Sequence, residues 1–137
     1  MSGPALKQLH AHHAIHQGTF TEAEEIMEII RQLCLQGSTD RALELSHILM
    51  EHWETRTLAH AEAEEEGFYL EKIQENPELT TLITKFKRDH ELVKILVNET
   101  KELLQQREIN QAILTRLEAI LAIVEIHSRE EEMYLLS

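Results

Sequence analysis

The 137-residue chain contains only one cysteine, four glycines and two prolines, and aromatic residues make up just 4% of it. The single cysteine, Cys34, excludes an internal disulfide and a thiolate-rich metal site, and it favours a reducing compartment. So few glycines and prolines leave few turns, which favours long helices. Because hydrophobic residues make up 42% of the chain and aromatics are scarce, the core must be mainly aliphatic.

Other absences narrow the class of protein further. Alternating runs that are typical of strands are missing, no stretch is long and apolar enough to span a bilayer, and the N-terminus lacks the apolar core of a signal peptide. The formal charge of −12 argues against nucleic acid and anionic membranes as partners, because both attract basic surfaces. We therefore expect one cytoplasmic domain over residues 1–137, a length that can bury a real core.

Apolar residues recur at alternating steps of three and four, which predicts four helical segments. These run from about Ala5 to Gln36, from about Arg41 to Gln74, from Pro77 to about Leu104, and through the stretch that carries Ile113 and Leu135. Three short connections separate them, and short connections force neighbouring helices to run antiparallel. The prediction is an all-α fold, an antiparallel up-down-up-down four-helix bundle. Gly18 and a capping-box pattern after it leave open a kink or break in the first helix.

The apolar stripes of all four predicted helices are interrupted by polar residues. Nine histidines are spread along the chain, and at least one falls on the inward stripe of each helix. In the second and fourth helices a glutamate follows the histidine by four residues. The inward polar residues are His13 and His16, His60 and Glu64, His90, and His127 and Glu131.

This spacing points to a metal site. Residues four apart lie on one helical face, so each His–Glu pair can converge on one ion or bridge two. Counted from the connecting turns at about 1.5 Å per residue, the groups on all four helices lie at a similar depth in the bundle. Burying two carboxylates near one another is costly, and a divalent cation removes that cost.

Competing motifs are incomplete. His12 and His16 have the four-residue spacing of zinc proteases, but the general-base glutamate of that motif is missing. Glu44 and His47 form one Glu-x-x-His pair, whereas ferritin-like di-iron proteins need two. There is no glycine-rich phosphate loop. His10 and His12 are placed at the edges of the first stripe, and His47 and His52 farther from the polar layer. Arg56 is placed on the inward side of its helix.

The sequence resembles the hemerythrin-like family, also called the HHE cation-binding domain. The resemblance covers nearly the whole chain and is carried by the His13 region, His60-Ala-Glu-Ala-Glu64-Glu65, Asp89-His90-Glu91 and His127-Ser-Arg-Glu-Glu131-Glu132. It implies a four-helix bundle around two irons joined by oxo or hydroxo and carboxylate bridges. The implied ligands are His13, His60, Glu64, His90, His127 and Glu131, with the glutamates bridging and His16 as a further histidine. Lys94 stands where marine hemerythrins have another histidine.

The function that this pattern favours is binding, sensing or detoxifying a small ligand such as O2, NO or peroxide. A small-ligand-binding protein is favoured over a dedicated enzyme. The alternatives are a di-iron oxidase or peroxidase, in which Tyr69 or Tyr134 passes electrons, and a metal-dependent regulatory or iron-handling protein. Zinc fits the same ligands. The sequence leaves open the metal, the oligomeric state, and whether His12 or His16 binds in addition to His13.

Overall fold

The computed structural model describes residues 3–136, and of residues 3–10 it describes only the backbone. Helices α1 (Gly3–Leu35), α5 (Thr80–Leu104) and α6 (Gln111–Tyr134) are long and regular. Between α1 and α5 the chain forms one continuous helical segment of five parts, which are α2 (Thr39–His52), η1 (Trp53–Leu58), α3 (Ala59–Ala63), η2 (Glu64–Phe68) and α4 (Tyr69–Glu75). A short 3₁₀ turn, η3 (Pro77–Leu79), precedes α5. No strand occurs among the described residues, so the all-α prediction is confirmed.

The turns lie where the sequence predicts them. Gly37 has a φ of 75°, a left-handed conformation that suits glycine and ends α1. Asn76 and Asn110 cap the following helices, since their side chains accept hydrogen bonds from the backbone N–H groups of Glu78 (3.1 Å) and Ile113 (3.0 Å). Helix α1 continues through Gly18, so the break that the sequence left open does not occur.

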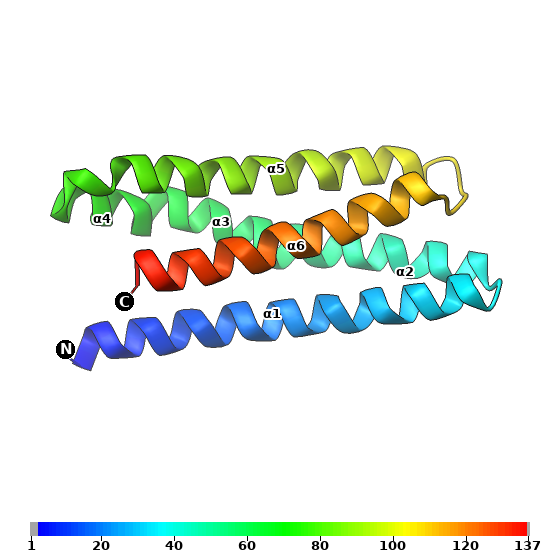
Figure 1. Ribbon diagram of the computed structural model, residues 1–137, viewed down its shortest axis with the longest axis horizontal. Coiled ribbons are helices and arrows are strands. Elements are labelled where there is room, and N and C mark those ends of the chain that lie inside the picture. The colour runs from blue at the N-terminus through cyan, green and yellow to red at the C-terminus, as the bar shows by residue number, and fades with distance from the viewer. Residues whose placement is uncertain (1–2, 137) are drawn as a thin grey trace.

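The four helical segments lie side by side along the long axis of the molecule (Figure 1). Helix α1 packs against α2 and α6, and α5 packs against α6 and α2. The core is aliphatic apart from a few large aromatic side chains, as the composition predicts. Its fully buried members include Met27, Ile30, Leu49, Trp53, Phe86, Leu117 and Ile120. No helix within residues 3–136 has the length and apolar character needed to cross a membrane.

Two π-helical segments, η1 and η2, change the register of the second helical segment. A π turn closes i→i+5 hydrogen bonds, so it holds more residues than an α turn and rotates the residues after it about the helix axis. Tyr69 comes directly after η2 and is fully buried, whereas Phe68 is only partly buried. The expectation that Arg56 lies on the inward face is wrong, because it assumed uninterrupted α-helix. Arg56 is exposed with its guanidinium 3.8 Å from Glu22.

Candidate metal centre

A cluster of buried histidines and glutamates lies in the core between the four helical segments. Its ligand atoms fall into two groups, each with all atoms within 4.8 Å of one another. The first group consists of His12, His16, His60 and Glu64, and the second of Glu64, His90, His127 and Glu131. Buried His and Glu side chains that converge in this way can hold a metal ion.

In the first group, ring nitrogens from α1 and α3 meet one glutamate. His12 Nε2 lies 2.9 Å from Glu64 Oε2 and 3.4 Å from His60 Nε2. The ring of His16 lies edge-on to that of His12, with 4.1 Å between centroids. His12 and His16 are one turn apart on the buried face of α1, so the helix presents both rings to α3.

In the second group, α5 and α6 contribute a facing pair of histidines. The Nε2 atoms of His90 and His127 are 3.2 Å apart. His127 Nε2 is also 3.2 Å from Glu131 Oε2, which is one turn further along α6. Two ring nitrogens this close cannot both present lone pairs without repulsion, unless a proton or a cation lies between them.

The two glutamates connect the groups. Glu64 Oε2 faces His12 and His60, while Glu64 Oε1 lies 3.6 Å from His90 Nε2. Glu131 repeats this arrangement, with Oε1 3.0 Å from His12 Nε2 and Oε2 near His127. Glu131 Oε1 is buried and faces the ring nitrogens of His12 and His16, at 3.0 and 3.6 Å. Each carboxylate therefore turns one oxygen toward each group, as a bridging ligand does.

The histidines and glutamates of the cluster can balance one another's charge without a cation. Burial alone would lower the pKa of His12, but hydrogen bonds to Glu131 and Glu64 raise it to about 9. Burial likewise opposes the charged form of His127, and Asp89 and Glu131 raise its pKa to about 9. The pKa of Glu131 falls below its usual range despite burial, because His12 and His127 stabilise its charged form. Protonated histidines thus occupy the charge-balancing role that a metal would take.

His16 behaves differently from its neighbour. Burial first, and then repulsion from charged His12, lowers the pKa of His16 to about 3. Its imidazole is therefore neutral at physiological pH, which is the state that binds a metal.

Two further carboxylates hold the outer ring nitrogens of the second group. Asp89 Oδ2 lies 2.8 Å from His127 Nδ1, and Glu65 Oε2 lies 3.0 Å from His90 Nδ1. In the neutral imidazole, an Nδ1–H that donates a hydrogen bond to a carboxylate leaves the Nε2 lone pair facing the cluster.

Tyr69 closes the cluster on the side of α4. Its hydroxyl donates a hydrogen bond to Glu131 Oε2 and lies 3.4 Å from His90 Nε2. Its ring stacks on that of His90 with an interplanar angle of 8°. Burial and the charges of Glu131 and Glu64 raise the pKa of Tyr69 well above its usual range, which keeps the phenol protonated.

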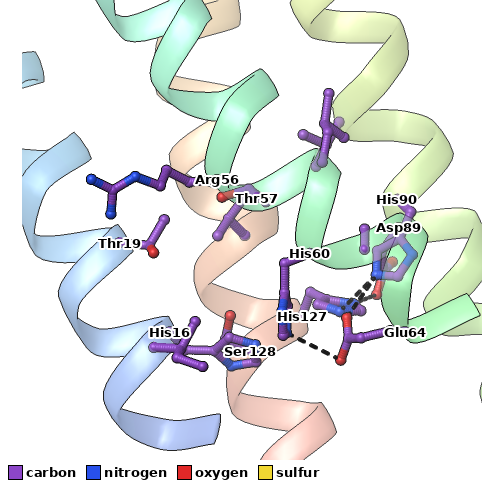
Figure 2. Close-up of a pocket in the computed structure, with 15 residues that line it drawn as sticks. His16, Thr19, Arg56, Thr57, His60, Glu64, Asp89, His90, His127 and Ser128 are labelled. Carbon is purple, nitrogen blue, oxygen red and sulfur yellow. Dashed lines mark hydrogen bonds and ion pairs between the residues drawn. The ribbon is translucent and has the colours of Figure 1, made fainter. Parts of the chain in front are cut away.

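A small cavity of about 40 Å³ adjoins the cluster. Figure 2 shows His60, Glu64 and His127 lying close together in it, with Thr19 and Arg56 farther along the pocket. Leu58, Val93 and Val124 supply apolar lining. Since a single water needs roughly 10–15 Å³ of such space, the cavity has room for a diatomic molecule or a few waters.

Most of the predicted metal ligands meet in this cluster. His16, His60, Glu64, His90, His127 and Glu131 all belong to one or both groups. His13 does not, because it faces away from the core. Its side chain is 58% exposed and its Nδ1 lies 2.9 Å from Glu132 Oε2. Its neighbour His12 is buried in the cluster instead.

The remaining sequence expectations have mixed outcomes. His47 is exposed and belongs to neither group, while His52 is largely buried with its Nε2 3.0 Å from the backbone oxygen of Thr19. The side chain of His10 lies outside the described residues. Tyr134 is 57% exposed, so of the two tyrosines only Tyr69 adjoins the site. Cys34 is a free, partly buried thiol that packs against the core.

Comparison of the chain with protein-family models, curated proteins and solved structures finds no match.

Proposed function

We propose that this protein is an antiparallel up-down-up-down four-helix bundle with a two-metal non-haem iron centre that binds, senses or detoxifies a small ligand such as O2, NO or peroxide. The contacts between helices support the antiparallel order. His13 in the first half of α1 contacts Glu132 on α6. Arg31 near the end of α1 contacts Glu118, which lies earlier on α6. In the second helical segment, Glu54 contacts Lys101 on α5. The later residue Glu65 contacts His90, which lies earlier on α5.

The arrangement of the two glutamates carries the proposal of two metals. A single ion would be coordinated by one oxygen of a carboxylate or by both oxygens together. Glu64 and Glu131 instead each divide their oxygens between two groups of histidines. This is the geometry that two neighbouring cations bridged by carboxylates require.

The donor set favours iron over a structural zinc. Imidazole and carboxylate are ligands that suit non-haem iron, whereas structural zinc sites usually have four ligands and are closed. Five histidines and two glutamates shared between two ions leave coordination positions for another ligand. Bound iron would supply reversible redox chemistry and binding of a small molecule at such a position. Zinc remains the alternative metal.

The cavity limits the size of that small molecule. About 40 Å³ beside His60, Glu64 and His127 accommodates O2, NO or peroxide, but not an organic substrate. Leu58, Val93 and Val124 make part of the wall apolar, which suits a neutral diatomic ligand.

These residues also support the proposal that the chain is hemerythrin-like. The order of ligands along the chain is a histidine pair, a His-x-x-x-Glu, a single histidine and a second His-x-x-x-Glu. We place His12 rather than His13 in the proposed ligand set, because His12 is the one that faces Glu64 and Glu131.

The buried phenol favours a second candidate function, a di-iron oxidase or peroxidase. Tyr69 contacts both Glu131 and His90, so a donor of protons or electrons lies next to the proposed centre. Turnover of peroxide in the presence of a reductant, lost in Tyr69→Phe and kept in Tyr134→Phe, would favour this function over simple binding.

The test is anaerobic loading with Fe²⁺ followed by exposure to O2 and, separately, to NO. We expect about two irons per chain and a new charge-transfer absorption with each gas. His60→Ala should lower the iron content sharply, while His47→Ala, which changes an exposed histidine, should not. Unchanged absorption with both gases in fully loaded protein would contradict ligand binding.

A further inference from the structure

The two proposed metal positions differ in how their histidines are held. In the second group the outer nitrogen of each ring lies against a carboxylate, His127 against Asp89 at 2.8 Å and His90 against Glu65 at 3.0 Å. Both imidazoles are buried, while Asp89 and Glu65 are only partly so. These carboxylates lie outside the cluster and contact it only through the rings.

Such contacts strengthen a histidine as a ligand in two ways. Donation from Nδ1–H fixes the tautomer, so that Nε2 carries the lone pair, and it fixes the plane of the ring. The negative charge behind the ring also makes Nε2 a better electron donor. The two Nε2 atoms of the second group are already 3.2 Å apart and face the same space. Little reorganisation is therefore needed before a cation binds there.

The first group lacks this support within the described residues. His12 Nδ1 and His16 Nδ1 are both buried and make no hydrogen bond to any described residue. No described carboxylate holds either Nδ1 as a hydrogen-bond donor, since His16 Nδ1 comes no closer than 3.5 Å to the carboxylate of Glu132. The third histidine, His60, is partly exposed to solvent.

We propose that the two metal positions fill in a fixed order. The position formed by Glu64, His90, His127 and Glu131 binds its metal first and more tightly. The position of His12, His16 and His60 fills second and releases its metal first. Asp89 and Glu65 are positioning residues for the tight position. This inference rests on the proposed two-metal centre and adds to it a singly loaded state, in which the tight position is filled and the exchangeable position between α1 and α3 is empty.

The experiment is a titration of the full-length metal-free protein with Co²⁺, followed by visible absorption, with Zn²⁺ competition to measure affinity. The wild-type protein should bind in two steps at least about 10-fold apart in affinity. His16→Gln should weaken the second step and leave the first unchanged. Asp89→Ala should weaken the first step by about 10- to 100-fold, which is the usual cost of losing such an outer partner.

Controls separate positioning from general damage. Asp89→Glu should restore most of the affinity of the first step. Glu62→Gln, which changes an exposed carboxylate that contacts neither group, should leave both steps unchanged. A purely structural role for Asp89 would lower the unfolding temperature of the metal-free protein, yet leave the Co²⁺ absorption of the first step as in the wild type.

The outcomes distinguish this inference from the proposed function. Two steps of equal affinity, or loss of the first step in His16→Gln, would overturn the order of filling while the two-metal centre stands. Normal first-step affinity in Asp89→Ala would overturn the positioning role. Failure of the wild-type protein to bind any metal would overturn the proposed function as well.

Discussion

Glu64 Oε2 and His12 Nε2 lie 2.9 Å apart in the core, although 52 positions separate the two residues in the chain. The contact joins the N-terminal half of α1 to the start of the π-helical segment η2. It also distinguishes two adjacent histidines, because His12 faces the cluster and His13 faces Glu132 near the surface.

The first prediction compares these two neighbours. His12→Ala removes a ring nitrogen that contacts Glu64 and Glu131, so it should lower the metal content per chain. His13→Ala should leave the metal content within error of the wild type, since His13 is largely exposed and pairs with Glu132. Elemental analysis of both variants after identical loading measures this difference. A larger loss in His13→Ala than in His12→Ala would show that the register of α1 is wrong.

The second prediction concerns the buried phenol. Tyr69→Phe removes the donor to Glu131 Oε2 and leaves a buried carboxylate oxygen with one partner fewer. Unsatisfied buried groups of this kind cost about 1–3 kcal/mol, so the metal-free variant should unfold at a lower denaturant concentration. Tyr134→Phe, at a residue that is 57% exposed, should have no measurable effect.

The third prediction is a dependence of stability on pH. The folded-state pKa of about 9 for His12 and for His127 lies above their ordinary value of 6.5. Each therefore contributes stability that is complete below pH 6.5 and is lost as the pH rises through about 9. The unfolding temperature of the metal-free protein should fall between pH 6.5 and 9.5. A constant or rising unfolding temperature over that range would contradict the assigned ion pairs.

Metal should reverse this trend. A cation must displace the protons on His12 and His127, so its affinity should increase as the pH rises from 6.5 to 9. The increase in unfolding temperature on adding Zn²⁺ should accordingly be larger at pH 8.5 than at pH 6.5. Calorimetric measurement in buffers of different ionisation enthalpy would count the protons that metal binding releases.

The fourth prediction tests the packing of the bundle independently of the site. Ile120 is fully buried in α6, whereas Ile126 on the same helix is 45% exposed. Ile120→Ala should lower the free energy of unfolding by about 2–5 kcal/mol, because it removes core contacts and leaves a cavity. Ile126→Ala should cost far less. Comparable losses in the two variants would contradict the placement of this helix face.

Much of the fold can be predicted from the sequence, since a period of three to four residues and three turn signals specify helices and their ends. Gly37, Asn76 and Asn110 mark ends that the structure confirms. The same periodicity places His16, His60 and His127 toward the core, because they continue stripes of large apolar residues that are themselves buried.

The sequence leaves the roles of two residues of the cluster, His12 and Tyr69, open for different reasons. His12 lies one turn before His16, on the face that continues to Ala23 and Met27, so a stricter register for α1 would have selected it over His13. Tyr69 lies five residues after Glu64, a spacing that an α-helix does not place on one face. The π-helical segment η2 brings it inward, and no signal in the sequence marks that change of register.

The most direct test of the proposed centre is anomalous scattering at the iron edge from crystals of iron-loaded protein. Two peaks are predicted, one between His12, His60 and Glu64 and one between His90, His127 and Glu131. Fully loaded crystals with no peak beside Glu64, or with peaks only on the exposed acidic surface, would contradict the two-metal centre.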